Sequence, residues 1–274
     1  MSKLSDYLDT LDVHVDGTYR GDCPMCYGRN TFTVTNERGN LLYNCYKAGC
    51  AVHGAKHTNM DAFTIKTLLS QAQQVNTSYE QYLTDAFDMP PYMSPVTQDN
   101  EAVRSFMTKW NIDPDDVMYD IRQDRIVFPV YTEGNVLVDA VGRALDGRQP
   151  KWLRYASSPV PYVHGTGNIA ILVEDAISAY VIGEQFPNLV GVALLGTQLT
   201  DFHKWYIGCR WGEGTVYVAL DRDARDKTLS IMKELRPLVK KVQGLNLSDD
   251  LKYLHEDDVK VLEEINAEML YGRG

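Results

Sequence analysis

The stretch "IAILVEDAISAYVIGEQF", residues 169–186, decides the fold class of this chain. Its first five residues form an uninterrupted apolar run, as in a strand buried on both faces, and the remainder has the length and composition of a helix. The same order recurs further on, with apolar runs at 189–196 and 216–220, a helical pattern at 226–239 and a candidate edge strand at 240–247. Alternating strands and helices indicate an α/β domain with a mostly parallel sheet flanked by helices.

Three acidic residues directly follow two of these apolar runs. Glu174 comes after the first run, and Asp221 and Asp223 come after "VYVAL". The carboxyl ends of parallel strands meet at one edge of a sheet, and residues i and i+2 of an extended chain point to the same side, so the three carboxylates can face one ion. Carboxylate oxygens favour Mg²⁺ or Mn²⁺. In the alternative interpretation, Asp223 or Asp226 only caps the helix that follows.

Four of the five cysteines stand in two close pairs. Cys23 and Cys26 are separated by two residues, Cys45 and Cys50 by four, and the stretches "TFTVT" and "LLYNC" between the pairs read as a β-hairpin. This spacing is typical of a zinc ribbon, in which two turns bind one structural Zn²⁺ ion through four thiolates. Four unrelated buried cysteines are the alternative. His53 is an alternative to Cys50 as the fourth ligand.

The composition indicates a globular protein rather than a disordered one. The chain has 274 residues, 44% of them apolar, and a net charge of −10. No apolar stretch is long enough to cross a membrane, and the N-terminus has acids where a signal peptide needs basic residues, so we expect a cytoplasmic protein with reduced thiols. Cys209 has no partner nearby and is expected to be a small buried hydrophobe.

The cysteine segment differs in charge from the rest of the chain. Residues 23–56 hold four basic side chains against a single acid, although the chain as a whole is acidic. "YGRNTF" and "YKAG" also place aromatic beside basic residues, a composition that suits stacking on bases and contact with phosphates. A purely architectural ribbon is the alternative.

The remaining segments read as connectors, helices and one hairpin. Residues 61–74 have helical periodicity, and 88–100 are rich in proline and polar residues and are expected to be irregular. A short helix is expected at 101–110, and "RIVFPVYTEGNVLVDAVGRAL" reads as two strands around a turn at 133–135. Residues 255–274 read as an amphipathic helix.

Several motifs resemble a known family. "ILVEDAISA", "VALLGTQLT" and "VYVALDRDA" resemble the Toprim domain of primases, topoisomerases and some nucleases. The preceding zinc ribbon narrows the resemblance to DNA primases of the bacterial and bacteriophage type. The segment "RIVFPVYTEGNVLVDAVGRALDGRQPKWLRY" is similar to the RIxFPxxxxxGxxxGxxxR…PKYL stretch of that family.

The resemblance implies a zinc ribbon, a linker and an RNA polymerase domain whose catalytic half is Toprim. The implied division is a zinc-ribbon template-recognition domain at 1–60, a linker at 61–100, an N-terminal subdomain of the polymerase domain at 101–165, a Toprim catalytic subdomain at 166–252 and a C-terminal helical tail at 253–274.

The resemblance also assigns roles to single residues. Glu174 matches the Toprim glutamate, and Asp221 with Asp223 matches its metal-binding D-x-D motif. Three residues match positions that are basic in the family and lie near the nucleotide and the template. They are Arg125, Arg143 and Lys151.

The sequence departs from the family at three places. Primases often read E-G-x-x-D after the first Toprim strand, whereas this chain reads E-D-x-x-S and ends the motif at Ser178. Trp152 stands where tyrosine is commoner. A later acid of the family is matched by Asp249 or Asp250, with Asp249 preferred.

The function implied by the resemblance is that of a DNA primase, a nucleotidyltransferase that makes short RNA primers on single-stranded DNA from ribonucleoside triphosphates. It would use one structural Zn²⁺ ion and a catalytic Mg²⁺ or Mn²⁺ ion. The alternatives are a Toprim-type metal-dependent nuclease and a non-enzymatic zinc-ribbon module that binds nucleic acid, while a topoisomerase would need a larger chain.

The sequence also bears on partners and origin. It contains no G-x-x-x-x-G-K-[ST] loop, so a replicative helicase partner would be a separate protein. The C-terminal helix is a candidate docking site for it, or simply a solvated helix. The shortness of the chain and the style of its motifs suggest a bacteriophage enzyme that works in the host cytoplasm.

Overall fold

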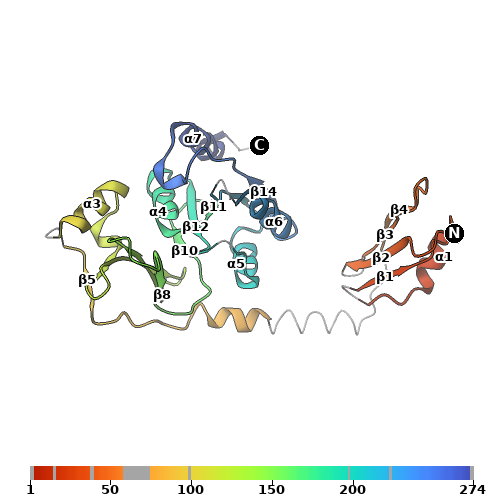
Figure 1. The fold of residues 1–274 in the computed structure, drawn as a ribbon, viewed down its shortest axis with the longest axis horizontal. Helices are drawn as coiled ribbons and strands as arrows, with labels where there is room; N and C mark the ends of the chain where they lie inside the picture. Colours follow the sequence, from red (N-terminus) through yellow and green to blue (C-terminus); the bar gives the residue numbers. More distant parts are fainter. Residues whose placement is uncertain are drawn as a thin grey trace. The chain divides into compact units, whose positions relative to one another are not determined.

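The computed structural model of the chain describes residues 3–14, 17–37, 40–57, 75–97, 100–196, 198–221 and 224–271. The chain divides into two compact units, Met1–Asn76 and Thr77–Gly274 (Figure 1). The helix predicted at 61–74 lies outside the described residues.

The first unit is a small antiparallel β-structure with one short helix. Its sheet has the order β1-β2-β3-β4. The elements are α1 (Lys3–Thr10), β1 (Thr18–Gly21), β2 (Phe32–Glu37), β3 (Asn40–Cys45) and β4 (His53–His57). The predicted hairpin is confirmed, because β2 and β3 pair antiparallel with Phe32 opposite Cys45. The core of this unit is small and consists of Leu8, Cys23, Phe32, Val34, Leu41 and Cys45.

The second unit contains two five-stranded sheets, of which the first is antiparallel with the order β5-β6-β7-β8-β9. Its strands are β5 (Met93–Pro95), β6 (Met118–Asp120), β7 (Arg125–Tyr131), β8 (Leu137–Ala144) and β9 (Trp152–Arg154), and α3 (Glu101–Trp110) and η1 (Pro114–Asp116) lie between β5 and β6. The hairpin predicted around 133–135 is confirmed as β7 and β8. The expectation of an irregular segment at 88–100 is wrong for β5. That strand lies at the sheet edge, where a proline such as Pro95 is tolerated because no second neighbour needs its N–H.

The second sheet is mostly parallel and has the order β10-β12-β11-β13-β14. Its strands are β10 (Tyr162–His164), β11 (Ile169–Val173), β12 (Leu189–Ala193), β13 (Thr215–Val218) and β14 (Lys241–Gly244). Only β10 runs antiparallel to its neighbour β12. The predicted fold class is therefore confirmed, including the edge strand β14.

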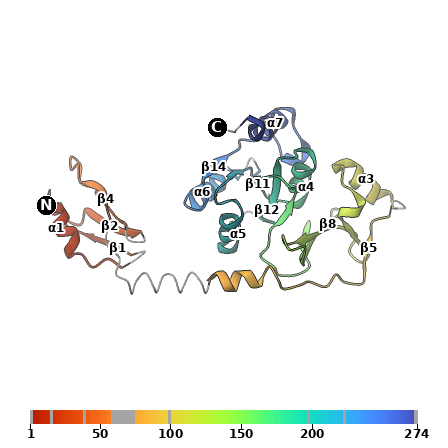
Figure 2. The same ribbon diagram turned by 180° about the vertical axis from the view of Figure 1, so that it is seen from behind.

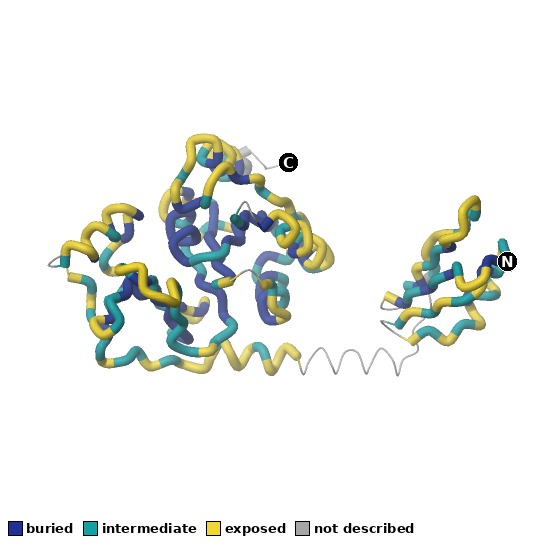
Figure 3. The backbone as a smooth tube through the Cα atoms, viewed as in Figure 1, coloured by how far each residue is buried: buried dark blue, intermediate teal, exposed yellow. Residues whose placement is uncertain are grey.

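Helices cover both faces of this parallel sheet. Figures 1 and 2 show α4 (Ala176–Gln185) on one face and α5 (Asp201–Trp211) with α6 (Arg225–Leu235) on the other, while η3 (Leu251–Tyr253) leads into α7 (Glu256–Tyr271). All residues of β11 and β12 are buried, which explains their uninterrupted apolar runs (Figure 3). No helix in the described part of the chain is both long and apolar enough to cross a bilayer.

The expectation that Cys209 is buried is wrong. Cys209 is exposed on α5. The face of α5 that packs inward carries Phe202, Tyr206 and Ile207, which recur at helical spacing. Cys209 lies two positions beyond Ile207 and therefore turns away from that face.

Gly191 gives a test of how closely α4 packs on the sheet. A Cβ atom at Gly191 would lie 2.0 Å from the carbonyl oxygen of Ala179 and 2.5 Å from its Cα. Because backbone atoms of a packed helix cannot move aside cheaply, Gly191→Ala is expected to lower the free energy of unfolding by about 3 kcal/mol, measured by urea denaturation. In Gly208→Ala on α5 the new Cβ would meet Leu238 at 3.6 Å, an ordinary contact. That control should be neutral or stabilise by about 1 kcal/mol, and equal losses in both variants would contradict the packing argument.

Candidate active site and metal centre

The four cysteines of the first unit form one cluster. Their sulfur atoms all lie within 4.8 Å of one another, and Sγ of Cys26 is 3.7 Å from Sγ of Cys45. Tetrahedral Zn²⁺ with Zn–S bonds of about 2.3 Å places its sulfurs about 3.8 Å apart, so the donor set fits this ion. The fourth sulfur is that of Cys50, whereas His53 is part of β4 and pairs with Asn44.

Two hydrogen-bonded turns bring the sulfurs together. In the first turn the backbone N–H of Tyr27 donates to the carbonyl of Cys23 at 2.9 Å, and in the second the N–H of Cys50 donates to the carbonyl of Lys47 at 3.0 Å. The hydroxyl of Thr31 lies 3.4 Å from Sγ of Cys45 and is the main cause that lowers the pKa of that thiol to about 6, with help from the neighbouring cysteines. Burial and the same neighbours raise the pKa of Cys50 to about 12, so the crowded thiols do not all ionise together without a cation between them.

Loss of the metal should unfold the first unit and leave the second intact. The apparent binding free energy of a structural zinc ion is about 10–16 kcal/mol, which exceeds what the small core of the first unit can supply. We expect Cys45→Ser, or removal of zinc by a chelator, to empty the cysteine cluster of zinc and to expose the amides of β2 and β3 to hydrogen exchange. Cys209→Ser is the matched control and should keep its zinc. Full amide protection of β2 and β3 in the zinc-free protein would contradict this expectation.

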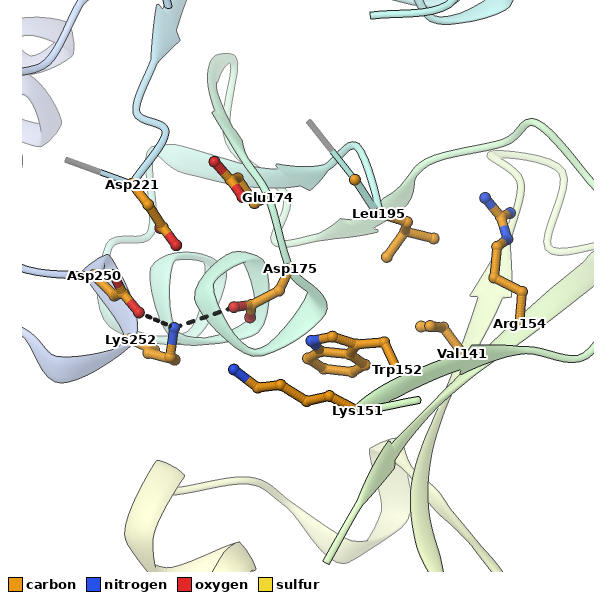
Figure 4. A pocket seen from close by; sticks show the side chains of 11 residues that line it. Val141, Lys151, Trp152, Arg154, Glu174, Asp175, Leu195, Asp221, Asp250 and Lys252 are labelled. Atoms are coloured by element: carbon orange, nitrogen blue, oxygen red, sulfur yellow. Dashed lines mark hydrogen bonds and ion pairs between the residues drawn. The ribbon is translucent and has the colours of Figure 1, made fainter. Parts of the chain in front are cut away.

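A cavity of about 300 Å³ lies between the two sheets of the second unit (Figure 4). One side comes from β8, β9 and the segment before β9, and the other from the carboxyl ends of the parallel strands. The lining residues are Val141, Lys151, Trp152, Arg154, Glu174, Asp175, Leu195, Gly196, Asp221, Asp250 and Lys252.

The structure brings Glu174 and Asp221 to this one cavity. β11 and β13 are parallel neighbours in which Leu172 pairs with Val218, so the residues that follow them leave the sheet at the same level. Asp223 lies outside the described residues. The capping role predicted for Asp223 is not tested by the described residues, and the N-cap residue of α6 is Ala224, whose own side chain makes no capping hydrogen bond. Asp226 lies in its first turn, where its charge interacts favourably with the helix dipole.

The cavity is also lined by an ion-pair network that the sequence did not predict. Nζ of Lys252 lies 2.5 Å from Oδ2 of Asp250 and 3.2 Å from Oδ2 of Asp175. Burial alone would lower the pKa of Lys252, but Asp175 and Asp250 together raise it above its ordinary value, so the side chain stays protonated. Asp250, not the preferred Asp249, lines the cavity.

Two of the three predicted basic residues lie at or beside the cavity. Lys151 lines it, and Arg143 packs on Trp152 with its guanidinium carbon 5.3 Å from the ring centroid. Burial lowers the pKa of Arg143, while Asp175 and Tyr253 counteract this shift. Within the described part of the chain, Nε and Nη1 of Arg143 are buried and meet no hydrogen-bond acceptor. Arg143 therefore offers unused donors, the feature expected of a group that binds an anion.

Arg125 lies elsewhere, fully buried beneath the segment that carries Lys151. Its Nη2 donates to the carbonyl of Pro150 at 2.8 Å, and its Nη1 lies 3.4 Å from the carbonyls of Gly142 and Lys151. This geometry favours a positioning role for Arg125. Its direct contact with nucleotide or template stays a prediction.

Comparison with solved structures returns DNA primases, the class of protein that the sequence motifs resemble. One match is the Aquifex aeolicus primase with its zinc-binding and RNA polymerase domains, at a TM-score of 0.44 and 17% identity, covering 96% of this chain and 83% of that one. Another is the primase fragment of the bacteriophage T7 primase-helicase protein, at a TM-score of 0.42 and 12% identity, covering 90% of this chain and 99% of that one.

A third match is the DnaG primase catalytic domain bound to single-stranded DNA. It has a TM-score of 0.43 and 19% identity and covers 62% of this chain, while this chain spans 60% of that one. No protein-family model matches the sequence, and no curated protein matches it.

The Lys252 network should matter for stability. Removing the ammonium in Lys252→Met leaves two carboxylates without their cation in a largely buried site, so we expect a loss of about 3 kcal/mol in the free energy of unfolding, measured by urea denaturation. Lys204→Met is the matched control. Lys204 also contacts two carboxylates, those of Asp201 and Glu234, but these are exposed, and its loss should cost about 1 kcal/mol at most. A Lys252→Met variant as stable as the control would show that the network is solvated.

Proposed function

We propose that this chain is a DNA primase, a DNA-directed RNA polymerase that makes short RNA primers on a single-stranded template. The observation that carries the proposal is the arrangement of Glu174 and Asp221. They follow neighbouring parallel strands and line one cavity, together with the cationic side chain of Lys151. Carboxylates at strand ends opposite phosphate-binding cations are what nucleotidyl transfer through a divalent ion requires.

Glu174, Asp221 and Asp223 would hold the catalytic Mg²⁺ or Mn²⁺ ion. When bound, this ion supplies activation of the attacking 3′-hydroxyl and neutralises charge on the triphosphate. The donor set fits, since all three residues offer carboxylate oxygens, the ligands that these hard cations prefer. Two clustered carboxylates at one cavity wall also repel each other, which raises their affinity for a cation.

Arg143 and Lys151 would bind the phosphates of the incoming nucleotide. Arg143 brings buried N–H groups that have no acceptor, and stacking on Trp152 fixes the plane of its guanidinium. Lys151 adds a mobile point charge from the exposed segment before β9. Arg125 would act through this segment, because it donates hydrogen bonds to the carbonyls of Pro150 and Lys151.

The first unit would read the template. Its two metal-binding turns each present a largely exposed tyrosine, Tyr27 at 72% and Tyr46 at 67% relative exposure. Arg29 and Lys47 stand beside them in the sequence. Exposed aromatic rings next to cations can stack on unpaired bases while the cations contact phosphates.

The proposal extends to the organisation and partners of the chain. The ribbon at 1–60 would recognise template, 61–100 would link it to the polymerase subdomains at 101–165 and 166–252, and the tail at 253–274 would follow them. A separate replicative helicase would be the protein partner. Such an enzyme, of bacterial or bacteriophage type, would act in the bacterial cytoplasm.

A priming assay tests the proposal. Single-stranded DNA of varied sequence is supplied with labelled ribonucleoside triphosphates and Mg²⁺, and short RNA products are resolved by size. Glu174→Gln and Asp221→Asn should each lower the rate by about 100-fold or more, because losing a metal ligand removes several kcal/mol of transition-state stabilisation. Asp201→Asn, an exposed carboxylate on α5, is the matched control and should prime like the parent chain.

The same assay separates the alternatives. Cut template without synthesis would identify a Toprim-type nuclease. Template binding without either product, unchanged in Glu174→Gln, would identify a non-enzymatic module that binds nucleic acid. Either result would overturn the primase proposal.

A further inference from the structure

Three metal-binding side chains meet on the surface of the second unit, among residues that do not line the candidate catalytic cavity. Asp116 belongs to η1, His164 to β10 and Glu184 to the last turn of α4. One ligand atom from each lies within 4.8 Å of the other two. Nε2 of His164 and Oε1 of Glu184 are 2.8 Å apart. The cluster combines an imidazole with two carboxylates, drawn from three separate elements.

Two tyrosines fix the orientation of these side chains. The hydroxyl of Tyr180 donates to Oδ2 of Asp116 at 2.7 Å and accepts from the backbone N–H of Asp113 at 3.0 Å. The hydroxyl of the buried Tyr162 lies 3.4 Å from Nδ1 of His164. Histidines and carboxylates that bind metals in proteins are usually oriented by such hydrogen bonds, which are made by the side-chain atoms that do not contact the metal.

The scaffold beneath the cluster is rigid. The imidazole of His164 packs on the ring of Tyr180 with their centroids 4.2 Å apart. A Cβ atom at Gly183 would lie 2.5 Å from the carbonyl oxygen of His164, so α4 and β10 pack with their backbones in contact. Glu184 follows Gly183 directly, and its position relative to His164 is therefore set by this contact.

We propose that Asp116, His164 and Glu184 form a second metal site, which takes a divalent transition-metal ion such as Zn²⁺. One nitrogen and two oxygen donors suit Zn²⁺ better than Mg²⁺, which prefers oxygen ligands alone, and three protein ligands leave a position open for water. In the proposed site Nε2 of His164 would bind the metal. The neutral imidazole would then carry its proton on Nδ1 and could donate a hydrogen bond from there to the hydroxyl of Tyr162.

Such an ion would join the two halves of the second unit. Asp116 precedes β6 of the antiparallel sheet, whereas Glu184 ends the helix that covers the parallel sheet. The hydrogen bond between Tyr180 and Asp116 already spans this boundary. A bound ion would add a second link at the same place and stabilise the relative position of the sheets that border the catalytic cavity.

Titration calorimetry on the full chain tests the site. The protein is first loaded with one equivalent of Zn²⁺ to fill the cysteine cluster and is kept in excess Mg²⁺, and Zn²⁺ itself is then the titrant. We expect a second equivalent to bind and to raise the unfolding midpoint of the second unit. His164→Ala and Asp116→Asn should each weaken this second binding at least about 100-fold, because each removes a direct ligand. Tyr180→Phe should weaken it about 10-fold, as expected when an orienting hydrogen bond is lost.

Two controls make the outcome decisive. His255 lies 3.8 Å from a carboxylate oxygen of Asp257 on an exposed surface, so His255→Ala removes a histidine beside an acid without touching the cluster and should change nothing. Asp221→Asn should keep the second equivalent as well. If no Zn²⁺ binds beyond the preloaded equivalent, or if the second site survives His164→Ala or disappears with Asp221→Asn, the proposal is overturned and an ordinary ion pair between His164 and Glu184 remains.

Discussion

The candidate active site depends on balanced charge at one edge of a buried sheet. Four carboxylates line a cavity of about 300 Å³, namely those of Glu174, Asp175, Asp221 and Asp250. Ionised carboxylates in such a small volume repel one another and lose hydration, so they persist only where cations offset them. Lys252 contacts two of the four, Asp175 and Asp250, and its single positive charge offsets part of their negative charge. Glu174 and Asp221 line the same cavity at the ends of neighbouring strands, and in the proposed function they would hold the divalent ion.

A scaffold must hold these four carboxylates in place against their mutual repulsion. The strands that carry Glu174 and Asp221 are buried neighbours, and their parallel hydrogen bonds fix the register of the two strand ends. α4 is fixed beneath them, because Gly191 lets its backbone contact β12. The opposite wall is held by Arg125, which donates to the carbonyls of Pro150 and Lys151 and to that of Gly142 on β8. The walls of the candidate catalytic cavity are therefore held by paired strands, a closely packed helix and hydrogen bonds to the backbone.

The sequence predicts the parts of this site that depend on local periodicity. Glu174 and Asp221 could be found because each directly follows an apolar run, and the cysteine cluster because its spacing repeats a known turn geometry. Lys252 and Asp250 could not be found in this way, because they come from an irregular segment around a short 3₁₀ helix, where no periodic pattern indicates direction. His164 was missed for a related reason, since a three-residue strand such as β10 is too short to show alternation.

The network around Lys252 also gives a physical reason for the departure of this chain from the E-G-x-x-D motif of the family it resembles. Here the second residue of the motif is Asp175, which caps α4 by accepting from the N–H of Ser178 and binds Lys252 with its other oxygen. The fifth position is Ser178, buried and uncharged. Compared with the family motif, the acid stands at the second position instead of the fifth. Its charge is offset there by Lys252, which comes from a distant segment of the chain. A carboxylate at 178 in addition would place a second, buried negative charge beside Asp175 and repel it. An uncharged serine at 178 avoids this repulsion.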